Sequence, residues 1–156
     1  VSDKIVGLLV GIIALLFVLQ HVVLKQNKNF KISLETSTRA GHFWGLISGF
    51  TSFIAHAGGP PFQIYAMPLR LDPKVFTSSS VLIFSVLNFL KIGPYLALGR
   101  LNLNLTWSAL TLMPVAICAT LLGAAIVKKM NAEIFYPIMY GFLTLIALRL
   151  IFVSML

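Results

Sequence analysis

The chain has 156 residues, of which 58% are hydrophobic and only 10% are charged. Because soluble domains contain about 45–50% apolar residues, this composition and the mean hydropathy of +0.95 exclude an ordinary soluble domain and indicate an integral membrane protein. The formal net charge of +8 would suit nucleic acid, but the Lys and Arg residues lie mostly between apolar runs, as in cytoplasmic loops. We therefore expect no nucleic-acid partner.

The first apolar run covers residues 5–24, which is long enough to cross roughly 30 Å of hydrocarbon as a helix. Ser2 and Asp3 before it are typical helix-start residues. The run is too long for the core of a secretory signal and has no small-residue cleavage site. It predicts a transmembrane helix, and a polar loop at residues 25–40 follows it.

The second run, residues 40–69, carries no charged side chain, yet the sequence Gly58-Gly59-Pro60-Pro61 lies inside it. As one helix at about 1.5 Å per residue it would be about 45 Å long, well beyond the hydrocarbon core. Glycine and proline interrupt helices, so the pattern predicts two short helices. These form either a broken spanning helix or a re-entrant hairpin.

Three further runs, residues 75–90, 105–127 and 134–156, predict spanning helices. Asp72 and Pro73 are a start signal for the first of them, which residues 92–98 can lengthen. Arg149 lies close enough to the end of the last run to reach the membrane surface. The fold class is therefore an all-α polytopic membrane protein.

The distribution of positive charge favours the hairpin. A re-entrant element would place most cations on one side of the membrane: Lys25, Lys28, Lys31, Arg39, Arg70, Lys74, Lys128 and Lys129. The other side would hold Lys4, Lys91 and Arg100. Such an asymmetry is typical of cytoplasmic loops, whereas a spanning element would divide the charges almost evenly.

Residues 11–15 (GIIAL) are similar to residues 141–145 (GFLTL), which suggests an internal repeat. The predicted domains are the last helix of a first repeat at 1–24, an inter-repeat loop at 25–40, and a complete second repeat of four elements at 41–156. A matching interruption would precede residue 1, so we expect a missing first half or a second copy to complete the fold. Duplicated membrane folds with interrupted helices are typical of secondary transporters.

The interruption itself predicts an anion site near the bilayer midplane. Pro60 and Pro61 suit the first turn of a helix, and the amides of Phe62 and Gln63 then point toward the break with the positive end of the helix dipole. Gly58 and Gly59 allow a ligand to approach the backbone. The carboxylates all lie at predicted helix ends or in loops, which favours an anionic over a cationic substrate: Asp3, Glu35, Asp72 and Glu133.

His56 can donate a hydrogen bond to the anion or carry a coupled proton, or it can simply bond a neighbouring carbonyl. The other candidate substrate-binding side chains are polar residues within apolar runs: Gln63, Tyr65, Ser78, Ser79, Asn88 and Lys91. Each also has a structural interpretation, such as a bond to helix backbone for the serines or anchoring at the interface for Lys91. We expect no metal and no cofactor.

Three segments carry a family resemblance: residues 45–65 (GLISGFTSFIAHAGGPPFQIY), 76–80 (FTSSS) and 88–99 (NFLKIGPYLALG). Over residues 41–156 the chain resembles the second half of the sulfite exporter TauE/SafE family of bacterial permeases. The resemblance implies a duplicated multi-pass fold in the bacterial inner membrane and transport of sulfite or organosulfonates coupled to protons. The eight spanning segments usually ascribed to members favour a spanning element over the hairpin.

Two other classes of function compete with transport. An intramembrane enzyme would need a base or a metal beside a nucleophile; Ser52 lies one turn before His56, but no carboxylate lies in the membrane to orient the imidazole, so we do not expect an enzyme. A structural or regulatory membrane subunit is the alternative to a permease. Such a subunit has no need of a broken helix at bilayer depth.

Overall fold

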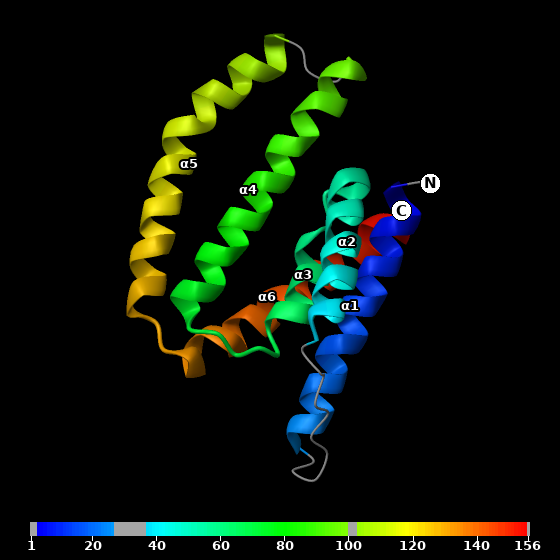
Figure 1. The fold of residues 1–156 in the computed structure, drawn as a ribbon, viewed down its shortest axis with the longest axis vertical. Helices are drawn as coiled ribbons and strands as arrows, with labels where there is room; N and C mark the ends of the chain where they lie inside the picture. The colour runs from blue at the N-terminus through cyan, green and yellow to red at the C-terminus, as the bar shows by residue number, and fades with distance from the viewer. Residues whose placement is uncertain (1–2, 27–36, 100–102, 156) are drawn as a thin grey trace. The chain divides into compact units, whose positions relative to one another are not determined.

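The computed structural model describes residues 3–26, 37–99 and 103–155 (Figure 1). Within these ranges every regular element is a helix: α1 (Asp3–Gln26), α2 (Thr38–Ala55), α3 (Gly59–Ala66), α4 (Pro73–Ala97), α5 (Leu103–Lys129) and α6 (Ala132–Met155). Four stretches are long and apolar enough to cross a membrane: Asp3–Val22, Pro73–Ala97, Ala109–Lys129 and Ala132–Met155. The predicted all-α polytopic membrane fold is confirmed. Most of the predicted inter-repeat loop, residues 27–36, lies outside the described residues.

The chain forms two compact units. The first, the hairpin unit, contains Val1–Leu71 and Glu133–Leu156, and the second, the α4–α5 unit, contains Asp72–Ala132. In the hairpin unit, α1, α2 and α3 pack on one another. In the α4–α5 unit, the two long helices are neighbours.

Helices α1 and α6 lie antiparallel at very close range. A Cβ added to Gly7 would lie 2.9 Å from Ser154 Oγ, and one added to Gly11 would lie 2.9 Å from the carbonyl oxygen of Ala147. Glycines allow such an approach, which is the usual basis of helix packing in lipid. A stripe at four-residue spacing on α1 is buried in the same region: Val6, Val10, Ala14 and Val18.

Helices α2 and α3 form a hairpin, as the re-entrant alternative requires. Ser48 Oγ on α2 donates a hydrogen bond of 2.7 Å to the carbonyl of Gly58 at the break. Gly41, near the start of α2, faces the hydroxyl of Tyr65 near the end of α3. The two arms are therefore antiparallel and side by side, as Figure 1 also shows.

The backbone at the break explains why the chain turns back. His56 ends α2 in the left-handed conformation, with φ 51° and ψ 25°. The next residues cannot continue α2, and the two prolines fit the first turn of α3, where no amide hydrogen is needed. A left-handed cap followed by proline is a common way to end a helix sharply.

The hairpin tip lies nearer one end of α1 than its middle. Ala57 packs with Val6 and Val10 of α1, which are about one and two helical turns from its start. The sequence predicts a break near the bilayer midplane. The candidate membrane span of α1 covers Asp3–Val22. Because Ala57 contacts Val6 and Val10, the hairpin tip lies nearer the N-terminal end of that span than its middle.

The α4–α5 unit exposes most of its apolar surface. Asp72 caps α4 by accepting a 2.9 Å hydrogen bond from the amide of Lys74, as the sequence predicts. The described side chains at 109–126 in α5 are all exposed. A helix that is apolar on all sides belongs in lipid or against further membrane helices.

Candidate functional site

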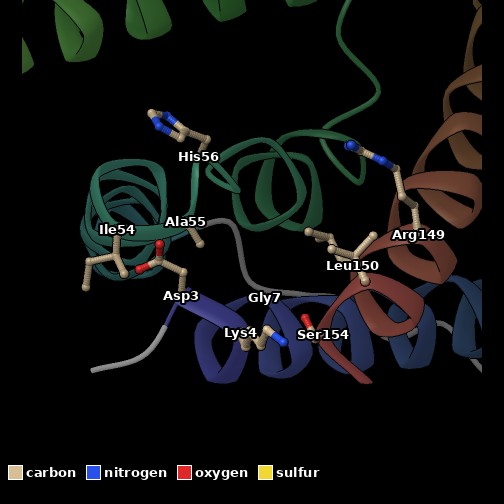
Figure 2. Close-up of a pocket in the computed structure, with 10 residues that line it drawn as sticks. Asp3, Lys4, Gly7, Ile54, Ala55, His56, Arg149, Leu150 and Ser154 are labelled. Atoms are coloured by element: carbon tan, nitrogen blue, oxygen red, sulfur yellow. The ribbon is translucent and has the colours of Figure 1, made fainter. Parts of the chain in front are cut away.

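The candidate functional site is a pocket of about 270 Å³ at the tip of the hairpin, here called the tip pocket. Three parts of the hairpin unit enclose it: the start of α1, the end of α2 and the end of α6 (Figure 2). The lining residues are Asp3, Lys4, Gly7, Ile54, Ala55, His56, Arg149, Leu150, Val153 and Ser154. All of them belong to one compact unit.

The antiparallel packing of α1 on α6 explains the chemistry of the tip pocket. It brings the first turn of α1, with Lys4, to the end of α6, with Arg149 and Ser154. Two cationic side chains and one carboxylate, that of Asp3, therefore share the lining with polar His56 and Ser154. Cations and hydrogen-bond donors grouped in this way can hold a small anion.

His56 is exposed and lines this pocket, and its ring points away from Lys4 and Ser154 (Figure 2). Its left-handed backbone is uncommon for a residue with a Cβ and costs about 1–2 kcal/mol relative to the right-handed form. Strained backbone of this kind tends to occur at binding sites, where the surrounding packing holds it. Here the packing of Ala57 on α1 holds it.

The two glycines at the break differ. A Cβ added to Gly58 would lie 2.6 Å from the carbonyl oxygen of Ser48, whereas a Cβ added to Gly59 would have nothing within 4 Å. Gly58 therefore serves the packing of the hairpin, and Gly59 leaves open space at the start of α3. The sequence predicts ligand approach at both positions, and the open space exists at Gly59.

The first residues of α3 are mostly buried in the hairpin or bonded to its backbone. Pro60 and Pro61 are buried, and the amide of Phe62 donates to the carbonyl of Gly58 at 3.3 Å, so this amide closes the first turn of α3. Gln63 Oε1 is a buried side-chain oxygen with no hydrogen-bond donor among the described residues. A buried acceptor in this state calls for a water or solute that brings a donor.

Tyr65 is half-buried against Gly41, so its ring has a packing role between the arms of the hairpin. The predicted candidates on α4 lie in the other unit. Ser78 Oγ donates to the carbonyl of Lys74 at 2.7 Å, which is the structural interpretation given above for membrane serines. Ser79 is half-buried.

Asn88 and Lys91 are brought together on α4. Lys91 Nζ lies 3.4 Å from Asn88 Oδ1, and Lys91 is only 7% exposed although it is charged. A mostly buried lysine on an apolar helix is rare and needs polar partners. This pair is a second polar centre, within the α4–α5 unit.

The sequence analysis did not place Lys4, Arg149 and Ser154 at the candidate site, although all three line the tip pocket. It assigned Lys4 and Arg149 to the membrane surface because each lies near the end of an apolar run. The available signal was Gly7 with Gly11, whose spacing predicts a closely packed partner helix. The spacing does not show that this partner is α6 or that α6 runs antiparallel to α1. It is this packing that places Lys4 and Arg149 in one pocket.

No group of His, Cys, Asp and Glu within 3–26, 37–99 and 103–155 has the arrangement of a metal site. The long apolar helices of the described chain define a multi-pass membrane protein. The model of the sulfite exporter TauE/SafE family matches residues 1–150, and the chain belongs to that family. No curated protein and no solved structure matches the chain.

The match extends the resemblance noted in the sequence from residues 41–156 to the preceding helix and loop. Membership gives the general function, export of an anion of the sulfite type across a membrane. It also gives the class of protein, a family of transporters.

Proposed function

We propose that this protein carries small sulfur-containing anions, sulfite or an organosulfonate, across the bacterial inner membrane together with protons. The tip pocket is where the anion meets the protein. The observation that carries this proposal is that Arg149, Lys4 and His56 all line one pocket at the hairpin tip. A structural or regulatory subunit has no use for two cations and a strained histidine around one pocket.

Arg149 is the principal anion ligand in this proposal. Its guanidinium presents a planar fork of N–H donors that matches two oxygens of a sulfite or sulfonate group. In the same pocket Ser154 supplies a neutral hydroxyl close to Gly7, and Lys4 adds a second positive charge. Asp3 keeps the pocket from being purely cationic, which helps the anion to leave again.

From the tip pocket the anion passes toward the start of α3. Gly59 follows three residues after His56 and leaves space beside the backbone, at the positive end of the α3 dipole. Gln63 lies one turn further along, and its side-chain amide N–H groups can donate to the same solute. His56, which lines the tip pocket and precedes Gly59, is the proposed carrier of the coupled proton.

Ser79, Asn88 and Lys91 are proposed to contribute from α4. The Asn88 and Lys91 pair supplies a further cation on an apolar helix, and Ser79 is a neutral donor. We also propose that the first half of the fold or a second copy completes the pathway. The exposed apolar side chains at 109–126 of α5 support this, because such a helix can pack against further membrane helices.

The test is transport by the full chain in liposomes, measured as sulfite flux together with the internal pH. Arg149→Gln should lower the flux at least about tenfold, since a hydrogen bond to a charged group contributes about 1.5–3 kcal/mol. Lys129→Gln removes an exposed cation that lines no described pocket and should leave the flux unchanged. Equal flux in both variants would contradict the role of Arg149, and flux of the parent chain no greater than that of empty liposomes would favour the structural subunit.

A further inference from the structure

A second cavity, of about 420 Å³, lies in the hairpin unit at the other ends of α1 and α6; it is here called the base pocket. Its lining residues are His21, Val22, Arg70, Glu133, Tyr136, Pro137 and Tyr140. None of them lines the tip pocket. The two pockets are therefore separate, and the transport mechanism proposed above does not use the second one.

The base pocket holds its arginine in a fixed pose. The guanidinium of Arg70 lies over the ring of Tyr136, 4.9 Å from its centroid. Tyr136 is fully buried and its hydroxyl donates a 2.7 Å hydrogen bond to the carbonyl of Leu71. The ring and the loop that carries Arg70 thus fix each other, although Arg70 is exposed.

This pose suits binding of an oxyanion. Stacking covers one face of the guanidinium and leaves the in-plane N–H groups directed outward. The backbone of Arg70 is left-handed, with φ 49°, and its amide donates to the carbonyl of Met67 at 3.2 Å. A loop without function could avoid that conformation with glycine or asparagine at this position.

The other side of the base pocket offers an acceptor and aromatic walls. The rings of His21 and Tyr140 are stacked, with centroids 4.0 Å apart and an interplanar angle of 10°. Glu133 lies in the first turn of α6 and lines the same cavity. A carboxylate can only accept hydrogen bonds when ionised, so it disfavours a simple anion and favours a ligand with a donor of its own.

We propose that the base pocket binds a small zwitterion, a sulfonate or phosphate group carrying an alkylammonium group. Arg70 binds the oxyanion, Glu133 binds the ammonium group, and the rings of Tyr140 and His21 cover the short alkyl segment. Free aminoalkyl sulfonates and the phosphoethanolamine head group of a lipid both present this chemistry. The site exists whether or not the tip pocket transports sulfite.

The experiment uses two probes that differ only in the ammonium group, 2-aminoethanesulfonate and ethanesulfonate. Binding is measured by calorimetry on the full chain in phosphatidylglycerol nanodiscs. The background is Arg149→Gln, which removes the principal cation of the tip pocket. We expect the aminosulfonate to bind at least about tenfold more tightly than ethanesulfonate, because the contact with Glu133 adds a charge-assisted bond.

Substitutions at two residues separate the roles of Glu133 and Arg70. Glu133→Gln should weaken binding of the aminosulfonate about tenfold and leave ethanesulfonate unchanged, so the second probe reports that the protein is folded. Arg70→Gln should weaken both probes, and Arg70→Lys should restore only part of the affinity, because lysine lacks the planar fork. Lys129→Gln is the matched control and should change neither.

Equal affinity for the two probes, or equal loss of both in Glu133→Gln, would overturn the proposal. The source of the ligand is decided by lipid composition. If phosphatidylethanolamine in the nanodiscs lowers the apparent affinity for the aminosulfonate, the lipid head group occupies the base pocket. If the affinity is the same in both lipids, the ligand is a free solute.

Discussion

At the scale of single residues, the hairpin depends on one glycine more than on its neighbour. Gly58 sits against the carbonyl of Ser48 and the side chain of Ser52, with a hypothetical Cβ 2.6 Å from each. Gly59 has open space instead. The same residue type therefore has a packing role at one position and leaves room for a solute at the next.

This difference predicts that replacement of glycine by alanine changes stability at position 58 and not at position 59. Gly58→Ala should lower the free energy of unfolding by about 1–3 kcal/mol, because backbone must shift to admit the methyl group. Gly59→Ala should leave stability nearly unchanged, since nothing lies within 4 Å. The apparent melting temperatures of the two purified variants in detergent, compared with the parent chain, check this. Similar losses at both positions would contradict the packing described for Gly58.

His56 allows backbone strain and side-chain function to be measured separately. Its φ of 51° costs a residue with a Cβ about 1–2 kcal/mol, and glycine escapes that cost. His56→Gly should therefore be more stable than His56→Ala by about 1 kcal/mol, although both lack the imidazole. If the imidazole serves transport, both variants lose sulfite flux to the same extent. Thermal unfolding together with flux in liposomes tests both statements, and a glycine variant no more stable than the alanine variant would argue against strain at this turn.

At the scale of elements, the contact between α1 and α6 decides whether the tip pocket exists. Gly11 faces the carbonyl of Ala147 and the side chain of Ile151, so α1 and α6 touch almost backbone to backbone. Separation of these helices would move Lys4 away from Arg149. The pocket is therefore a product of helix packing rather than of any one segment.

Gly11→Ala tests this packing against a control on the opposite helix. The new methyl group would lie 2.9 Å from the Ala147 oxygen, so we expect a loss of about 1–3 kcal/mol in stability and a fall in sulfite flux. Gly141→Ala, on α6, meets nothing within 4 Å and should keep both. Melting temperature and flux measured on the same preparations would show whether stability and transport fall together, and a harmless Gly11→Ala would contradict the close approach.

Much of the fold follows from local sequence, and the sites follow from it only in part. The spanning runs and the interruption at Gly58 to Pro61 are visible as hydropathy and helix-breaking residues, and the charge asymmetry favours the hairpin that is observed. Site residues supplied by other helices are not visible in this way. Arg149 and Lys4 line the same pocket as His56, and Arg70 reaches Tyr136, only because α6 packs antiparallel to α1. A single sequence does not specify that pairing of distant segments.

At the scale of the whole molecule, the hairpin determines how many times the chain crosses the membrane. Four described helices are long and apolar enough to span, and the antiparallel arms of the α2–α3 hairpin predict that the chain returns to the side of the membrane from which α2 starts. The segments before α2 and after α3 then share one side of the membrane. A spanning element would place them on opposite sides, and every later loop would then lie on the other side of the membrane.

Single cysteines at exposed positions distinguish these two topologies. In a Cys118→Ser background, which removes the exposed native thiol, cysteine is placed at Arg39, Lys74 or Leu98, each of which is exposed. The hairpin predicts that a membrane-impermeant maleimide added to sealed vesicles labels positions 39 and 74 together, with position 98 in the opposite class, because α4 crosses once between 74 and 98. Labelling of 39 with 98 rather than with 74 would mean that the interrupted element spans the bilayer. In that case the tip pocket and the base pocket would still flank the same helices, but the cation excess of the loops would no longer mark one side as cytoplasmic.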